Sequence, residues 1–303
     1  MCNQSSTKPY GPWDEKYPQL DPGNPGLRSP GPTEPIVYPY NPGDPYIMKP
    51  VSHSWADVSA MIVHCVHSSS QDIESHPIYD QLYQSINFNR DPNIVLVQYT
   101  EIYNHLFFGG MAKSSVVEYF ADHEVKIIFN LELVSDRARA KKVGLNDNLG
   151  LTIGSFRGKF NHVTIYILNG RILHPDWYYY QVIIDMLGTL AHEMIHAMQV
   201  MYTNYTGDGL GIIYAPHSTN FQKAAQAIEQ ATRDPPEGEG WIYPEIELGR
   251  DWAVLHDILF DKYKEPTDTE IRNMGLNVEA LRRIFRMYLL RPMRSIDQPS
   301  DFN

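Results

Sequence analysis

The 303-residue chain contains only two cysteines, Cys2 and Cys65. So few thiols exclude a scaffold held together by several disulfides, and they exclude a zinc site built from paired CxxC elements. No apolar segment of the signal-peptide type opens the chain, and no charge-free run of about eighteen apolar residues predicts a membrane span. We therefore expect an intracellular protein that has no membrane partner.

Basic residues are also scarce, since 25 Lys and Arg stand against 36 Asp and Glu and leave a net charge of −11. This balance opposes general affinity for nucleic acid. Residues 271–294 are the exception, because they carry six arginines and a single acidic residue, Glu279. Their spacing is compatible with a helix-turn-helix that contacts DNA. The simpler interpretation is two or three helices between 249 and 290 whose arginines are solvated.

The chain divides into three parts by composition. Residues 1–50 hold 12 of the 22 prolines and almost no apolar periodicity, so we expect a disordered or polyproline-like tail. The overall hydrophobic content of 43% is enough for an ordinary globular core. We place the main domain at 51–235 and a C-terminal helical extension at 241–303.

The most informative pattern is HExxH, formed by His192, Glu193 and His196 inside a long apolar stretch. Residues four apart lie on one face of a helix, so the two imidazoles can bind one metal ion while Glu193 lies beside the open coordination position. Apolar spacing predicts a helix over 177–201, with Asp176 as its N-cap. On a buried helix each of these polar residues needs a partner, and a metal ion satisfies all three.

A catalytic zinc ion needs a third protein ligand and one exchangeable water. Asp208, His217 and Glu229 are the candidates that follow the motif. We favour His217, because it lies in a turn that leads directly into an amphipathic helix pattern. The positive end of that helix dipole would help to keep the imidazole neutral. Asp208 and Glu229 remain the alternatives.

Strand patterns precede the motif. Residues 161–167 alternate, so that Val163, Ile165 and Ile167 face one side of a strand. In zinc peptidases an edge strand beside the metal commonly holds the substrate as an added strand through backbone hydrogen bonds. The periodicity does not reveal which strand forms the edge.

Five segments carry a family resemblance: the helix end at 103–110, the strand at 123–130, the glycine-punctuated hairpin at 149–168, the helix signature at 187–197 and the element that begins with His217. Together they resemble the SprT-like (Spartan-type) zinc metallopeptidase domain. The resemblance covers about residues 92–230. The family normally takes its third zinc ligand from the histidine at the place of His217. Ser218 departs from the pattern, because glycine is usual there.

The resemblance implies an α+β fold: a zincin-like minimal metalloprotease domain with a small antiparallel sheet packed on the HExxH helix, plus flanking helices. It also implies a zinc cofactor and a protein or peptide substrate, with proteins bound or crosslinked to DNA as the family's characteristic targets. A Cys-rich zinc module, which several relatives carry after the protease domain, is excluded by the cysteine count.

The expected chemistry is hydrolysis of a peptide bond by zinc-activated water, with Glu193 as the general base. An additional oxyanion donor is expected, and Tyr202, Tyr205 and Tyr214 are the candidates. The alternative function is a catalytically silent or gated zinc-fold protein that binds DNA or a protein partner through its C-terminal helices or its N-terminal tail. The sequence does not indicate the oligomeric state.

Overall fold

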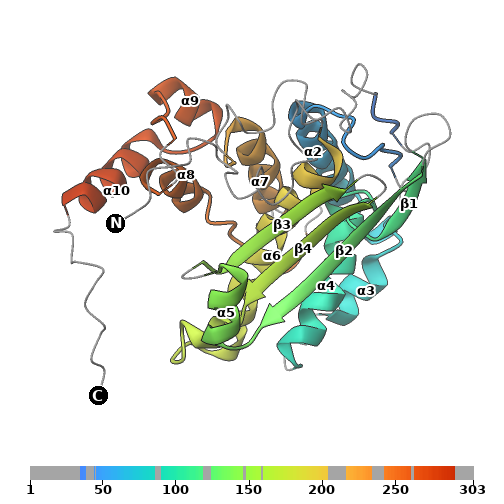
Figure 1. Cartoon of the computed structure of the whole chain (residues 1–303), viewed down its shortest axis with the longest axis horizontal. Helices are drawn as coiled ribbons and strands as arrows, with labels where there is room; N and C mark the ends of the chain where they lie inside the picture. Colours follow the sequence, from blue (N-terminus) through green and yellow to red (C-terminus); the bar gives the residue numbers. More distant parts are fainter. Residues whose placement is uncertain are drawn as a thin grey trace.

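The computed structural model describes residues 35–38, 44, 46–85, 90–118, 124–145, 148–157, 160–203, 216–233, 242–260 and 263–290. It is a mixed α+β structure, with helices packed around a four-stranded sheet (Figure 1). Within these ranges, no helix has the length and apolar character needed to cross a membrane.

The strands are β1 (Ser115–Glu118), β2 (Glu124–Val134), β3 (Gly150–Arg157) and β4 (Phe160–Leu168). The helices before the HExxH motif are α2 (Trp55–Gln71), η2 (Ile73–Ser75), α3 (Tyr79–Ser85), α4 (Pro92–Leu106), α5 (Arg137–Val143) and η3 (Gly170–Ile172). The motif lies on α6 (Tyr179–Tyr202), which is followed by α7 (Thr219–Thr232), α8 (Arg250–Leu259), α9 (Asp268–Asn273) and α10 (Val278–Leu290).

The sheet has the order β1-β2-β4-β3, and its two central strands, β2 and β4, run parallel, with Phe129 opposite Val163. The expectation of an antiparallel sheet is therefore wrong for this pair, although the other two pairs are antiparallel. A parallel pair needs a long crossover connection. Here α5 and β3 supply it, because the chain passes to the edge of the sheet in β3 and returns in β4 beside β2.

Helix α6 lies along β3 and β4 and also contacts α2 and α4. Val163, Ile165 and Ile167 of β4 are fully buried in the main core, as their alternation predicts. The helix begins at Tyr179 with Tyr178 as its N-cap, so the expected cap at Asp176 is wrong. Because α6 is apolar on most of its surface, the polar residues of the HExxH motif need partners within the protein.

The expected N-terminal tail ends earlier than residue 50. Tyr46 and Met48 are buried in the main core, and the backbone N–H of Tyr46 donates to the carbonyl of Gly109 at 3.0 Å. Gly109 has a positive φ of 55°, and a Cβ at this position would overlap the Tyr46 ring. The assignment of 46–50 to the tail is therefore wrong, and residues 1–34 lie outside the described residues.

The described C-terminal residues contribute to two cores. Ile242, Ile246 and Leu248 belong to the main core, so this segment packs on the domain that contains α6. Helices α8, α9 and α10 form a group beside α7 (Figure 1). They share a small core of their own, made of Val254, Leu255, Ile271, Met274 and Leu281.

The Arg-rich segment forms two helices, α9 and α10, joined by a turn in which Gly275 has a φ of 70°. Arg282 forms ion pairs with Glu265 and Asp268, the latter at 3.0 Å. This arginine therefore neutralises neighbouring carboxylates and offers less charge to a phosphate than the sequence indicates. The last two arginines, at 291 and 294, lie outside the described residues.

Candidate metal centre

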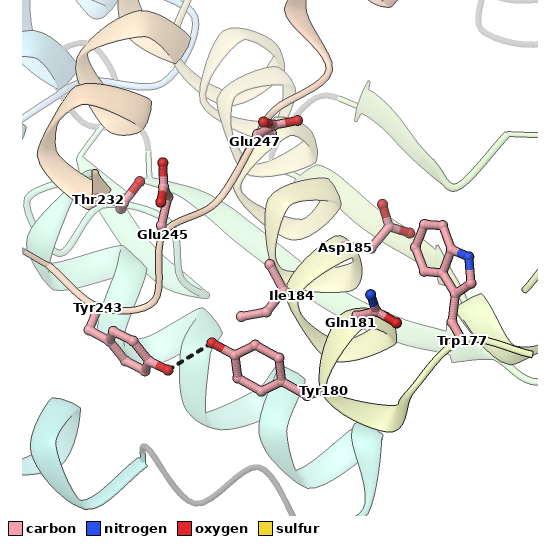
Figure 2. Close-up of a pocket in the computed structure, with 9 residues that line it drawn as sticks. All are labelled: Trp177, Tyr180, Gln181, Ile184, Asp185, Thr232, Tyr243, Glu245 and Glu247. Atoms are coloured by element: carbon pink, nitrogen blue, oxygen red, sulfur yellow. Dashed lines mark hydrogen bonds between the residues drawn. The ribbon is translucent and has the colours of Figure 1, made fainter. Parts of the chain in front are cut away.

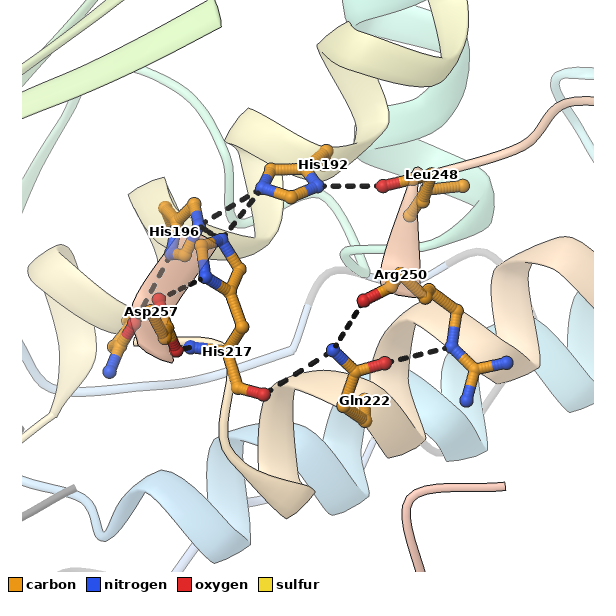
Figure 3. Close-up of polar contacts among 8 residues, drawn as sticks. His192, His196, His217, Gln222, Leu248, Arg250 and Asp257 are labelled. Atoms are coloured by element: carbon orange, nitrogen blue, oxygen red, sulfur yellow. Dashed lines mark hydrogen bonds and ion pairs between the residues drawn. The ribbon is translucent and has the colours of Figure 1, made fainter. Parts of the chain in front are cut away.

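Three imidazoles converge beside α6 (Figure 3). His192 and His196 project from successive turns of α6, and His217 lies in the turn immediately before α7. Their Nε2 atoms lie 3.0 to 3.2 Å from one another. Within the described residues, these three histidines form the single group of His, Cys, Asp or Glu side chains placed to hold a metal ion.

The Nδ1 atoms of two rings are already hydrogen-bonded. Nδ1–H of His192 donates to the carbonyl of Leu248 at 2.8 Å, and Nδ1–H of His217 donates to Oδ1 of Asp257 at 2.7 Å. A neutral imidazole that is protonated on Nδ1 carries a lone pair on Nε2. Two acceptor atoms therefore face each other in a half-buried site, and a cation between them would remove their repulsion.

The spacing of the three nitrogens fits zinc. Zinc–nitrogen bonds of about 2.0–2.1 Å in tetrahedral geometry place the ligand nitrogens about 3.3 Å apart. The observed separations of 3.0 to 3.2 Å are close to this value. Three protein ligands leave one position open, which is typical of catalytic sites and not of structural ones.

Burial favours the neutral form of both helix histidines. The pKa of His192 falls to about 3, chiefly because burial penalises the charged ring and secondly because the nearby His217 ring is an unfavourable neighbour for a charged imidazole. The pKa of His196 lies well below its ordinary value for the same two reasons. Both rings are therefore neutral at pH 7, and the neutral form is the one that binds a metal ion.

Glu193 follows His192 on α6 and is buried, with 6% of its surface exposed. Burial raises the pKa of its carboxyl to about 7, although hydrogen bonding by Thr152 opposes this rise. The hydroxyl of Thr152 donates to Oε2 of Glu193 at 2.8 Å. A carboxyl group with a pKa near neutrality can both accept a proton and release it, as a general base and acid must.

Strand β3 passes directly over this carboxylate because Gly150 has no side chain. A Cβ at Gly150 would lie 2.7 Å from Cγ of Glu193 and 2.6 Å from Cγ2 of Thr189. β3 is also an edge strand of the described sheet. The glycine therefore brings an edge of the sheet close to the candidate site.

Asp257 of α8 holds His217 at two points. Its Oδ1 accepts from the ring Nδ1–H, and its Oδ2 accepts from the backbone N–H of His217 at 3.0 Å. The side chain is almost fully buried. One carboxylate therefore fixes both the ring and the backbone that carries it, and such a partner makes the opposite ring nitrogen a better metal ligand.

Glu229 lies behind the histidines. Its Oε1 accepts from the backbone N–H of Leu248 at 2.9 Å, and its Oε2 pairs with Nη1 of Arg250 at 3.4 Å. Leu248 is the residue whose carbonyl holds His192. Glu229, the alternative third ligand, is absent from the candidate metal group of the described residues and instead supports the segment that positions His192.

The remaining sequence candidates do not join this group. Tyr202 is buried, and its hydroxyl donates to the carbonyl of Met111 at 2.9 Å. Its proton is therefore engaged in the core, which argues against a role as oxyanion donor. Asp208, Tyr205 and Tyr214 lie outside the described residues.

Sequence reasoning missed Thr152 and Asp257. Thr152 lies in a strand, where a threonine is common for reasons of β propensity and carries no signal of its own. Asp257 did carry a signal, because it falls four residues after Ala253 and three after Val254, both buried on α8. An acidic residue on the apolar face of an amphipathic helix needs a partner and is a candidate for a structural or functional contact.

Comparison of the chain with protein-family models, with curated proteins and with solved structures finds no match.

Proposed function

We propose that the protein is a zinc-dependent endopeptidase of the SprT-like type. The observation that carries the proposal is the convergence of the three Nε2 atoms of His192, His196 and His217 beside the buried carboxylate of Glu193. A purely structural metal site needs no neighbouring carboxyl with a pKa near 7. The helix that carries the motif and the sheet edge beside it support a zincin-like fold.

Each residue has a defined part in this chemistry. When bound, zinc would polarise the scissile carbonyl and lower the pKa of a coordinated water to about 7. Glu193 takes a proton from the attacking water and later gives it to the leaving amine. Thr152 orients the Glu193 carboxylate through the hydrogen bond to Oε2. Asp257 and the Leu248 carbonyl hold their two rings in the tautomer that leaves Nε2 free.

The substrate class follows from β3. An extended peptide that adds to this edge strand would be held by backbone hydrogen bonds, which are independent of side-chain identity. Thr152 of β3 contacts Glu193, so a peptide on this edge would have its backbone next to the general base. Peptides and unfolded protein segments therefore fit the site better than small metabolites.

The test uses zinc-loaded protein and casein as substrate. We expect Glu193→Gln to bind zinc with the wild-type stoichiometry and to cleave at least about a hundredfold more slowly, since general base catalysis contributes about 10²–10⁴-fold. His217→Ala should lose zinc. Glu101→Gln, an exposed carboxylate on α4, is the matched control and should cleave normally.

Full activity of Glu193→Gln would refute the mechanism. Zinc binding without cleavage by the wild type would instead favour the silent or gated binding protein. Adding single-stranded DNA to the same assay tests whether DNA activates the enzyme.

A further inference from the structure

A cavity of about 660 Å³ lies beside the N-terminal half of α6 (Figure 2). One wall comes from α6 and the residues just before it, and the other comes from the segment that leads to Leu248. Its lining includes Trp177, Tyr180, Tyr243, Asp185, Glu245 and Glu247. These residues include three carboxylates and three aromatic rings, and no Lys, Arg or His of the described chain lines the cavity.

The aromatic walls are held in place by their own contacts. The hydroxyl groups of Tyr180 and Tyr243 lie 2.8 Å apart and bridge the two sides of the cavity (Figure 2). Trp177 stacks on His174 with ring centroids 3.9 Å apart and an angle of 10° between the planes. The Trp177 and Tyr180 side chains remain 40% and 46% exposed, so their rings are accessible to a ligand. Aromatic faces near carboxylates attract organic cations.

Asp185 is the carboxylate that most needs a partner. Its Oδ2 atom is buried and has no hydrogen-bond partner among the described residues. Burial raises the pKa of this carboxyl, although the nearby His174 opposes the rise. A buried acceptor without a donor is costly. Asp185 lines the cavity, so rotation of its carboxyl group toward a cationic group bound there would supply the missing donor.

The cavity lies about two turns of α6 before the candidate metal centre. Asp185 and His192 are seven residues apart, so they lie on the same face of α6 and about 10 Å apart along its axis. Glu247 directly precedes Leu248, whose carbonyl accepts from His192. Gly188 lies between Asp185 and His192 on α6, and a Cβ at this position would overlap the carbonyl oxygen of Glu247. The close approach at Gly188 therefore fixes the position of the second wall.

This distance corresponds to a short piece of substrate. An extended peptide advances about 3.3 Å per residue, so 10 Å is about three residues. A peptide whose scissile bond lies at the histidines would therefore place a side chain three residues away at the mouth of the cavity. The chain direction on β3 decides whether this residue lies before or after the scissile bond.

We propose that the cavity is a specificity subsite that receives a lysine or arginine side chain of the peptide substrate, about three residues from the scissile bond. The proposal rests on the peptidase function proposed above. Asp185 and Glu247 bind the cationic group, while Trp177 and Tyr180 contact the aliphatic part of the side chain and the face of the cation. The substrate class is therefore a peptide segment with basic residues near the cleavage site.

The test uses a peptide whose cleavage site has been identified from casein products. The third residue on each side of the scissile bond is replaced in turn by lysine, arginine or norleucine, which lacks the charge but keeps a similar length to lysine. We expect lysine and arginine to raise kcat/KM about tenfold over norleucine at one of the two positions. Asp185→Asn combined with Glu247→Gln should reduce this ratio to about one. Glu101→Gln, on exposed α4, should leave the ratio unchanged.

A wild-type ratio of about one at both positions would overturn the subsite while leaving the peptidase intact, and so would a ratio that survives the double substitution. A binding arm separates this failure from failure of the peptidase function. This arm uses a matched pair of lysine and norleucine peptides of otherwise uncharged sequence, chosen without reference to a cleavage site. They are titrated by calorimetry into zinc-loaded Glu193→Gln protein, in which we expect about tenfold tighter binding of the lysine peptide. Loss of this preference on adding Asp185→Asn supports the subsite even if no peptide is cleaved, and equal binding of both peptides refutes it.

Discussion

Asp257→Asn should weaken zinc binding, although Asp257 is not itself a ligand in the proposed site. Asparagine has nearly the same shape, but it offers one acceptor oxygen to the two N–H groups of His217 that the carboxylate serves at 2.7 and 3.0 Å. Its amide NH₂ group then faces one of these donors. The ring of His217 would lose the contact that fixes its tautomer, its orientation or both.

The magnitude follows from the burial of the contact. Loss of a hydrogen-bonding partner behind a metal ligand typically costs about 10- to 100-fold in metal affinity, which is about 1.4–2.8 kcal/mol. Asp257 is only 2% exposed, so water cannot easily replace the missing acceptor. We therefore expect the zinc Kd to rise by close to a hundredfold.

Competition with a fluorescent zinc chelator at neutral pH measures this change. Asp251→Asn is the control, because Asp251 lies in the first turn of the same helix. This substitution removes the same charge from α8. Thermal unfolding of the zinc-free variants shows whether the fold is retained. Wild-type zinc affinity in a folded Asp257→Asn variant would refute the positioning role, and an equal loss in Asp251→Asn would attribute the effect to general electrostatics.

Two further predictions concern Gly150, beside Glu193, and Asp185, in the cavity wall. Gly150→Ala would place a methyl group 2.7 Å from Cγ of Glu193. We expect kcat to fall by up to about a hundredfold at unchanged zinc content. A normal kcat would show that β3 moves away and leaves Glu193 in place. Asp185→Asn should raise Tm at pH 7. The pKa of Asp185 is raised in the folded protein, so ionisation of this carboxyl is harder there than in the unfolded chain. The carboxyl therefore lowers stability as the pH rises above its unfolded-state pKa of about 3.9. The nearby His174 opposes part of the rise in the pKa of Asp185, and the gain in Tm should shrink towards pH 4. A gain that is constant with pH would point to a cause other than the charge.

The sequence predicted the local parts of the structure well. Apolar spacing of 3.6 residues located α6 to within two residues at its start, and the structure places His217 beside the pair on that helix, at the position indicated by the turn before α7. Alternation identified β4, because a strand buried on one face leaves a period of two in the sequence. Each of these features depends on residues that are close along the chain.

The features that sequence did not predict depend on distant pairing. Alternation gives the two faces of β4 but not its direction relative to β2. The two strands are parallel because the chain reaches β4 through the edge strand β3. The contact between Asp257 and His217 joins residues 40 positions apart, and no local pattern encodes it. The N-cap of α6 was missed because Gln181 provides the acceptor for Tyr178 N–H, whereas the acidic residue at 176 was the conventional candidate.

The hydrogen bonds from His192 to Leu248 and from His217 to Asp257 make the candidate metal centre depend on residues that follow position 235. A fragment that stops at residue 235 keeps all three histidines and Glu193, yet it lacks both Nδ1 acceptors. Its imidazoles would be free to exchange tautomers and to rotate. The three histidines and the groups that hold two of them thus lie in separate stretches of sequence, and a substitution in α8 would disturb the candidate site without altering the HExxH motif.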